Sequence, residues 1–228
     1  MVRWDRVDRG KPARSIGENL MNDVVAEFHK KYYGDRFTEL WGRTYYKGIP
    51  CQKCPLDLWV YHELLYTYKP EFVVELGVLS GGTTAFLCDM ADNMHLNTKV
   101  ITVDVLPVGL SVYPRMIPIL GSSIDPEVFK TVKHLVSNKT VIVILDSLHN
   151  KPHVLSELET YHPLIKVGGY LIVEDTNLNG HPVRDDWGPG PYEAVEEFLP
   201  NHPEFVVDPE CERFMLTFNP SGYLKRIK

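Results

Sequence analysis

The chain has 228 residues, of which 44% are hydrophobic and 24% charged, with a formal net charge of −6 and an isoelectric point near 5.8. This size and composition allow one domain with a buried core and a terminal extension. The acidic balance argues against a nucleic-acid-binding surface, which needs clustered Lys and Arg, and no apolar run reaches the length of a membrane span.

The first 54 residues are predicted to form a helical arm followed by a loop. Residues 1–8 lack the apolar region of a signal peptide, so we expect a cytoplasmic protein. A weak helical pattern includes Leu20, Val24 and Phe28, and aromatic residues lie between glycines in residues 36–50. We expect this arm to join subunits or to cover a pocket, and an ordinary packing extension fits the pattern equally.

Four cysteines do not form a disulfide framework for a secreted protein of this size. Cys51 and Cys54 form a single C-x-x-C with no second pair. Incidental thiols are the expectation, and zinc or redox chemistry is the alternative.

From residue 55 to residue 228, helical and strand patterns alternate regularly. Pro55 begins a helix that ends before Pro70, and a hairpin closes the chain, with strands near 204–208 and 213–218 joined at Pro209–Cys211. Between them, five apolar strand patterns are each followed by a turn or a helix: 72–76, 99–105, 117–121, 140–146 and 167–175. The pattern predicts a doubly wound α/β domain with a mostly parallel, seven-stranded sheet.

A glycine-rich turn follows the first of these strands. The glycines at positions 77, 81 and 82 do not match the dinucleotide-binding pattern, and Glu75 would repel a pyrophosphate. The segment Glu75–Gly82 instead resembles motif I of class I S-adenosylmethionine methyltransferases. That cofactor carries an amine and a sulfonium, so an acid at Glu75 is favourable.

Acidic residues end three of the predicted strands, at the edge where open α/β sheets bind ligands. Asp104 is placed to accept hydrogen bonds from ribose hydroxyls. Asp146, Glu174 and Asp175 end two strands that we expect to be neighbours, so their carboxylates converge. Clustered carboxylates repel, and a divalent cation, Mg²⁺ or Ca²⁺, resolves the repulsion. The alternative is that each acid only caps the following helix or turn.

Two histidines are candidates for acid–base chemistry near these acids. His149 can act as general base, hold Asp146 in place or cap a helix, and the sequence does not distinguish these roles. The Gly- and Pro-rich loop of residues 176–192 is predicted to form a lid or acceptor wall, in which His181 and Trp187 contact substrate or pack within the loop.

Several longer segments carry a more specific resemblance. The chain resembles the cephalosporin hydroxylase and rhamnosyl O-methyltransferase family of class I methyltransferases from about Trp41 to its C-terminus. The C-x-x-C pair is a departure from the family. The segments that carry the resemblance are Pro55–Trp59 with Glu63, Glu75–Gly82, Glu174–Pro182, Gly188–Val195 and Arg213–Pro220.

The resemblance implies S-adenosylmethionine and Mg²⁺ as cofactors, a small-molecule acceptor such as a sugar or an antibiotic-like natural product, and a homo-oligomer. It implies Asp146, Glu174 and Asp175 as metal ligands, and the candidate catalytic residues beside them are His149, Asp146 and His181. The residues expected to bind the cofactor are Glu75, Gly77, Ser80, Gly81, Gly82, Thr83, Asp104, Ser122, Ser123 and Asp146.

The expected reaction is transfer of the sulfonium methyl group to a hydroxyl oxygen by in-line displacement, with the metal chelated by two substrate oxygens. Three alternatives remain. They are N-methylation of an amino sugar, a nicotinamide-dependent oxidoreductase, and a protein that binds the cofactor without catalysis.

Overall fold

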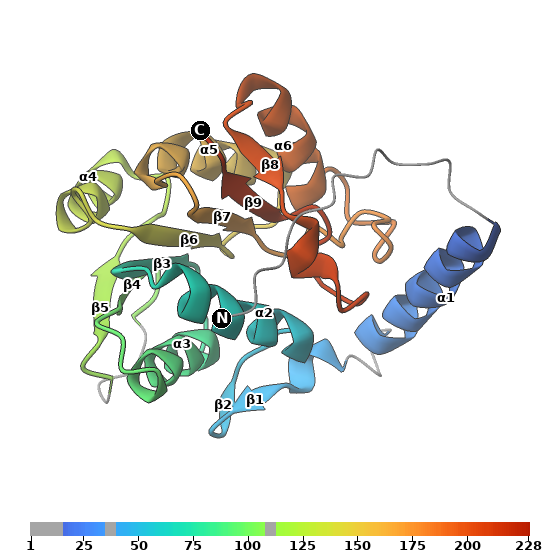
Figure 1. Ribbon diagram of the computed structural model, residues 1–228, viewed down its shortest axis with the longest axis horizontal. Helices are drawn as coiled ribbons and strands as arrows, with labels where there is room; N and C mark the ends of the chain where they lie inside the picture. The colour runs from blue at the N-terminus through green and yellow to red at the C-terminus, as the bar shows by residue number, and fades with distance from the viewer. Residues whose placement is uncertain (1–15, 35–39, 108–112) are drawn as a thin grey trace, which may run out of the picture.

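The computed structural model describes residues 16–34, 40–107 and 113–228. Within these residues a seven-stranded sheet has the order β5-β4-β3-β6-β7-β9-β8 (Figure 1). The first five strands are parallel, and β9 runs antiparallel to both β7 and β8. The strands are β3 (Phe72–Leu76), β4 (Lys99–Asp104), β5 (Met116–Leu120), β6 (Val141–Leu145), β7 (Tyr170–Val173), β8 (Phe205–Val207) and β9 (Tyr223–Arg226). This is the predicted fold class.

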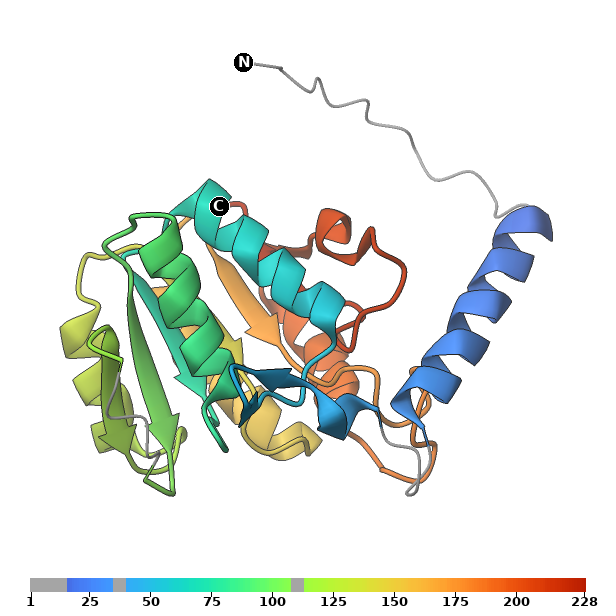
Figure 2. The same cartoon turned by 90° about the horizontal axis from the view of Figure 1, so that it is seen from below.

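Helices cover both faces of the sheet, as Figures 1 and 2 show. Side chains alternate along each strand, so Val73 packs toward the helices of one face and Val74 toward those of the other. The first face carries α2 (Pro55–Tyr68) and α3 (Gly82–Asn93). The second carries α4 (Pro126–Leu135), α5 (Lys151–Tyr161) and α6 (Pro191–Phe198). A strand covered on both sides reads as a continuous apolar run, which is why the sequence predicted these strands.

Helix starts follow the capping signals in the sequence. Asp125 caps α4 by accepting a hydrogen bond from the amide of Glu127, at 2.8 Å, and Pro126 takes the first helical turn. At the C-terminal end of α2, Lys69 adopts a left-handed conformation immediately before Pro70, and the helix ends there.

The N-terminal region contains the helix α1 (Ile16–Tyr33), which projects from the side of the domain (Figures 1 and 2). Tyr33 stacks on Trp41 and meets Phe218 edge to face, with ring centroids 5.7 and 5.5 Å apart. After η1 (Trp41–Arg43), the strands β1 (Tyr45–Tyr46) and β2 (Ile49–Pro50) form a hairpin where a loop was expected. The division of the chain at residue 54 stays a prediction, and residues 1–15 lie outside the described part.

The prediction for the last strand was wrong. Residues 213–218 form no strand, and β8 pairs instead with β9, after η4 (Pro209–Glu212) and a turn. The apolar residues of this segment are buried for another reason, because Leu216 and Phe218 pack against Tyr33 of α1 and Leu56 of α2. The Phe218 amide donates to Asp57 Oδ2 at 2.8 Å and Thr217 Oγ1 donates to Asp57 Oδ1 at 2.6 Å, so this segment pairs with a side chain and not with a strand.

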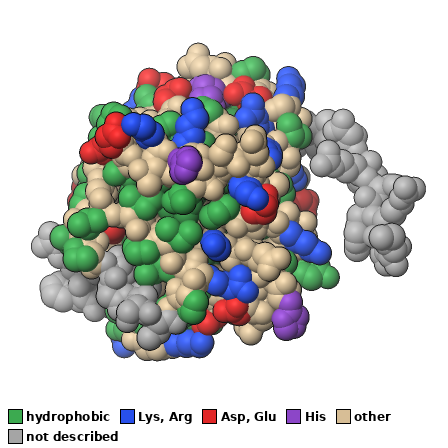
Figure 3. All heavy atoms as spheres, turned by 90° about the vertical axis from the view of Figure 1, so that its left-hand side faces the viewer, with side chains coloured by type: hydrophobic (Ala, Val, Ile, Leu, Met, Phe, Trp, Pro, Cys, Tyr) green, Lys and Arg blue, Asp and Glu red, His purple; other side chains and the backbone are tan. Residues whose placement is uncertain are grey.

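The sheet ends in the edge strand β5, and Figure 3 shows hydrophobic side chains gathered on this face of the molecule. Leu120 of β5 is exposed, as are Val105 and Leu106 after β4. The remaining short helices are η2 (His162–Leu164) and η3 (Leu199–Asn201). Among the helices described, none is both long and apolar enough to cross a lipid bilayer.

Candidate active site

A pocket of about 290 Å³ opens where β3, β4 and β6 end. It contains five of the residues expected to bind the cofactor, namely Gly77, Asp104, Ser122, Ser123 and Asp146. Sequence reasoning missed the rest of its wall, which is formed mainly by residues that follow the strands: Val78, Leu79, Val103, Val105, Leu106, Gly121, Ser147, Leu148 and His153. The wall is mostly apolar with a few polar groups, as is typical of small-molecule sites.

Gly77 brings two strand ends together at this pocket. Its φ of +86° lies in the left-handed region, and its amide donates to the carbonyl oxygen of Val103 at 2.8 Å. A Cβ atom at this position would overlap the backbone of Asp146 and Ser147. Glycine is therefore needed for the backbone after β3 to pass directly beside the backbone after β6.

Asp104 organises the glycine-rich turn. Its Oδ2 accepts hydrogen bonds from the amides of Val78 and Leu79 at 2.7 and 3.2 Å, and its Oδ1 accepts one from Leu106 at 2.9 Å. The carboxylate thus holds the turns after β3 and β4 around the pocket. Its role toward ribose hydroxyls stays a prediction.

Glu75 lies deeper, below the turn. It is 1% exposed and accepts a hydrogen bond from Thr84 Oγ1 in the first turn of α3. Burial raises the pKa of Glu75 to about 8. A cationic group placed against this carboxyl would restore its charged form.

The other motif residues bring α3 and the N-terminal hairpin together. Gly81, with φ +84°, is the N-cap of α3, and a Cβ at Gly82 would overlap the backbone of Pro50. Thr83 Oγ1 lies 3.5 Å from Cys51 Sγ, whereas Ser80 is exposed. The segment that follows β2 therefore packs directly on the start of α3.

The acids at the ends of β6 and β7 meet as the predicted strand order requires. Ligand atoms of Asp146, His149 and Asp175 all lie within 4.8 Å of one another, and His149 Nε2 is 3.3 Å from Asp175 Oδ2. Asp175 has a φ of +55° and its amide donates to Asn219 Oδ1 at 3.0 Å, which holds the turn after β7.

Lys53 lies between two of these carboxylates. Its Nζ is 2.6 Å from Asp146 Oδ2 and 3.1 Å from Glu174 Oε1, and the side chain is 5% exposed. Burial alone would lower the pKa of Lys53, but the charges of Asp146, Glu174 and Asp175 outweigh it and raise the pKa well above its ordinary value. Lys53 is the principal site residue that sequence reasoning missed.

Glu174 points away from Asp175 and into the protein. Its Oε1 accepts a hydrogen bond from the Tyr61 hydroxyl and pairs with Lys53. Its Oε2 is buried and has no hydrogen-bond partner among the described residues. Burial raises the pKa of Glu174 and of Asp146, while Lys53 opposes the shift in both.

The donor set at this edge suits a hard divalent cation. Asp146 and Asp175 offer carboxylate oxygens, whereas Glu174 is not among the clustered ligand atoms. His149 adds an imidazole nitrogen on the same side. The residues therefore fit Mg²⁺ or a similar ion, with Lys53 as the cation that neutralises Asp146 and Glu174 in the structure as it stands.

His181 has other partners. Its Nε2 is 3.0 Å from Glu193 Oε1, and its ring stacks on Tyr192 with centroids 3.8 Å apart. It therefore lies against the start of α6 and is not among the clustered ligand atoms. Trp187, by contrast, donates from Nε1 to the carbonyl oxygen of His149 at 2.8 Å, so the loop of residues 176–192 packs beside His149.

All four cysteines are free and buried. Burial raises the pKa of the Cys54 thiol to about 12, and it also raises that of Cys51. Such thiols stay protonated near neutral pH and are poor nucleophiles. This favours the interpretation of Cys51 and Cys54 as packing residues.

Comparisons with known proteins give a consistent picture. The sequence model of the rhamnosyl O-methyltransferase/CmcI family matches residues 38–227. The rhamnosyl O-methyltransferase of Mycobacterium tuberculosis (strain ATCC 25618 / H37Rv) is 38% identical over 214 residues, which cover 90% of this chain and 86% of the relative. That of Mycobacterium leprae (strain TN) is 35% identical over 213 residues, which cover 90% of this chain and 91% of the relative.

Solved structures agree with the fold. CmcI with Mg and SAM superposes with a TM-score of 0.65 at 21% identity, covering 97% of this chain and 88% of CmcI. The apo structure of CmcI gives a TM-score of 0.64 at 21% identity, covering 99% of this chain and 90% of CmcI. At this identity the likeness shows the fold.

Proposed function

The chain belongs to the rhamnosyl O-methyltransferase/CmcI family, and from that membership we propose that it transfers the methyl group of S-adenosylmethionine to a hydroxyl oxygen. The observation that carries the proposal is the meeting of Asp146, His149 and Asp175 beside the pocket at Gly77 and Asp104. A methyl donor in the pocket and an acceptor at the acids would then share Asp146, which belongs to both groups.

We assign the cofactor to the pocket beneath the glycine-rich turn. The apolar wall near Val105 and Leu106 suits the adenine ring, and Asp104 lies where the sequence predicted the ribose. Glu75 would pair with the amine of the cofactor, which would return its carboxyl to the charged form despite the burial that raises its pKa.

Asp146 and Asp175 are the proposed ligands of a divalent cation, whereas Glu174, the third ligand that the sequence predicted, pairs with Lys53 and Tyr61 instead. The metal would bind the acceptor oxygen, lower the pKa of its hydroxyl and fix its position. His149 would accept the hydroxyl proton at Nε2, and the carboxylate of Asp175, 3.3 Å away, would stabilise the imidazolium. S-adenosylmethionine would supply the methyl group for the acceptor oxygen, and His149 would hold the proton that this oxygen gives up.

The acceptor class follows from the relatives. Proteins 38% and 35% identical to this chain are named rhamnosyl O-methyltransferases. We therefore propose a hydroxyl of a rhamnosyl group or a similar sugar as the acceptor, with a second oxygen beside it to bind the metal. We also propose that α1 joins subunits of an oligomer, and a cytoplasmic location stays a prediction.

The test of the metal role is Asp146→Ala. We expect methyl transfer to a panel of rhamnose-bearing glycosides to be lost in this variant and in the wild type in excess chelator. Calorimetry should still detect S-adenosylhomocysteine binding by the chelator-treated wild type, in which the pocket wall is unchanged. Glu210→Ala, which removes an exposed carboxylate after β8, is the matched control and should keep full activity. Full activity in Asp146→Ala or in chelator would contradict the metal role.

A further inference from the structure

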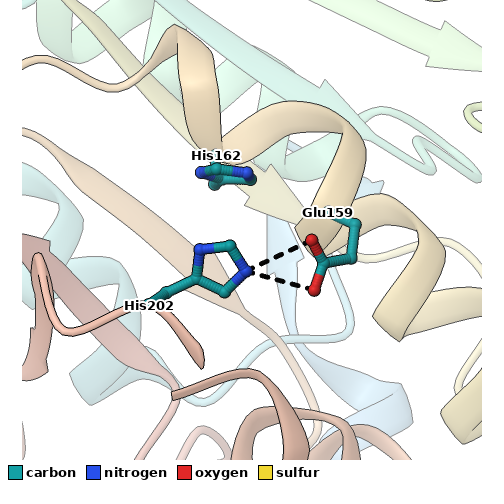
Figure 4. A group of neighbouring side chains, drawn as sticks. All are labelled: Glu159, His162 and His202. Carbon is teal, nitrogen blue, oxygen red and sulfur yellow. Dashed lines mark hydrogen bonds and ion pairs between the residues drawn. The ribbon is translucent and has the colours of Figure 1, made fainter. Parts of the chain in front are cut away.

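A second group of possible metal ligands lies outside the active site. Glu159 at the end of α5, His162 in η2 and His202 after η3 place one ligand atom each within 4.8 Å of the others (Figure 4). These residues come just before β7 and β8, so the group lies where these strands begin, whereas the pocket lies where β3, β4 and β6 end.

Aromatic packing fixes the two imidazoles. The ring of His202 stacks on the fully buried Phe198, with centroids 4.0 Å apart, and His162 meets Phe198 edge to face at 5.7 Å. The two imidazole rings lie 4.4 Å apart. Their side chains are 19% and 14% exposed, so both are held in place yet accessible from one side.

In one tautomer of His202, a ring lone pair faces a carboxylate. Glu204 Oε1 lies 3.4 Å from His202 Nδ1 and takes its proton as a hydrogen bond in the matching tautomer. His202 Nε2 then presents a lone pair to the two oxygens of Glu159, at 3.1 and 3.2 Å, as the dashed lines of Figure 4 mark. Acceptors that face one another in this way require a proton or a cation between them.

His162 contributes a further nitrogen. Its Nδ1 is buried and makes no hydrogen bond within the described residues, and Glu204 Oε1 is 3.9 Å away. A metal ion would give this buried ring nitrogen a partner. Arg226 adds one nearby positive charge, which the carboxylates of Glu159 and Glu204 outnumber.

We propose that Glu159, His162 and His202 bind a divalent transition-metal ion such as Zn²⁺, with Glu204 orienting His202 from its other nitrogen. Two imidazoles and one carboxylate are a common zinc ligand set, and a carboxylate on the far nitrogen is its usual second partner. The half-exposed Glu159 can close the remaining distance to about 2 Å from the ion. Imidazole nitrogens select against Mg²⁺, so this site differs in kind from the carboxylates of the active site. The ion would tie the end of α5 to the start of β8.

The test is a calorimetric titration of the chelator-treated full chain with zinc chloride in excess Mg²⁺. We expect one zinc ion per chain, bound at least about ten-fold more weakly by Glu159→Gln and by His162→Asn. Glu196→Gln, an exposed glutamate on α6, is the matched control and should bind like the wild type. Repeating the series in an Asp146→Asn background removes any zinc held at the active site.

A second readout uses folding stability. Zinc should raise the Tm of the wild type and of Glu196→Gln but not that of Glu159→Gln, because an ion that binds only the folded state stabilises it. Zinc binding of undiminished affinity in Glu159→Gln, or none in the wild type, would overturn the proposal. Glu159 is half exposed, so this variant decides the question even where His162→Asn fails to fold.

Discussion

At the residue scale, Lys53 determines the charge balance of the active site. Its ammonium contacts Asp146 and Glu174, and Glu75 is buried nearby. Removing one partner of a buried ion pair leaves an uncompensated charge, which costs far more than the loss of an exposed pair. Lys53 therefore supports the fold as well as the site.

Lys53→Met should lower the free energy of unfolding by about 3–5 kcal/mol, because the buried Glu174 and the partly buried Asp146 lose their counter-charge. Added Mg²⁺ should restore part of this stability if the same carboxylates hold a cation. The control is Lys47→Met, which breaks an ion pair of equal length, 2.6 Å to Asp89; because this lysine is 60% exposed, its loss should change the stability far less. Urea unfolding with and without Mg²⁺ measures the free energy of unfolding of both variants. An equal loss of stability in Lys53→Met and Lys47→Met would contradict the prediction.

At the element scale, the described side chains of α1, those of residues 23–33, contact the domain through one face of the helix. His29 Nε2 lies 3.0 Å from Asn177 Nδ2, and Tyr33 packs on Trp41 and Phe218. Val24 and Phe28, one helical turn apart, are 58% and 55% exposed. A helix that presents apolar residues on its outer face is suited to packing against a second copy.

Replacing Val24 and Phe28 together by serine should shift the sedimentation coefficient of the full chain toward that of a single subunit, because the apolar contact is lost. Methyl transfer should change little if the active site lies within one subunit. Tyr66→Ser on α2, which removes a side chain that is 63% exposed, should leave the assembly intact. A wild-type chain that sediments as a monomer would rule out this role for α1.

At the scale of the whole molecule, buried carboxyls set the pH dependence of stability. Burial raises the pKa of Glu75 to about 8 and that of Asp57 to about 7, and it also raises those of Asp146 and Glu174. A carboxyl whose pKa is higher in the folded state stabilises the fold below its unfolded pKa, and this stabilisation is lost as the pH rises through the folded value. His29 and His162, whose pKa values burial lowers, oppose this trend between pH 6.5 and about 7.5, because their unfolded forms still lose protons there, but their contribution is the smaller one.

We therefore expect the free energy of unfolding to fall between pH 6.5 and pH 8, by on the order of 1–2 kcal/mol for a single such carboxyl. Glu75→Gln should flatten this dependence, because it removes the buried carboxyl whose pKa burial raises to about 8. Chemical denaturation across the pH range provides the measurement. A stability that rises over this interval would show that the buried carboxyls are already ionised in the folded state.

Local patterns were sufficient for most of the fold. The apolar runs of the five parallel strands, the proline and acid signals of α2 and α4, and the glycines at 77, 81 and 82 are features of neighbouring residues, and they predicted the sheet and the pocket edge. The strand order then placed Asp146 and Asp175 together, since parallel strands end at one edge of the sheet.

Contacts between distant segments were decided only by the tertiary structure. Lys53 binds Asp146, which is 93 residues away in the sequence. Asp57 accepts a hydrogen bond from the amide of Phe218, 161 residues away, and the segment around Phe218 therefore packs as a turn where a strand was predicted. Adjacent acids also diverge, because Glu174 follows the inward face of β7 toward Tyr61 while Asp175 turns out to His149. The sequence by itself determined which residues follow the parallel strands at the pocket, because the apolar pattern of each strand shows where it ends. The direction and partner of each side chain there depended on burial and charge from segments far along the chain, which no local pattern encodes.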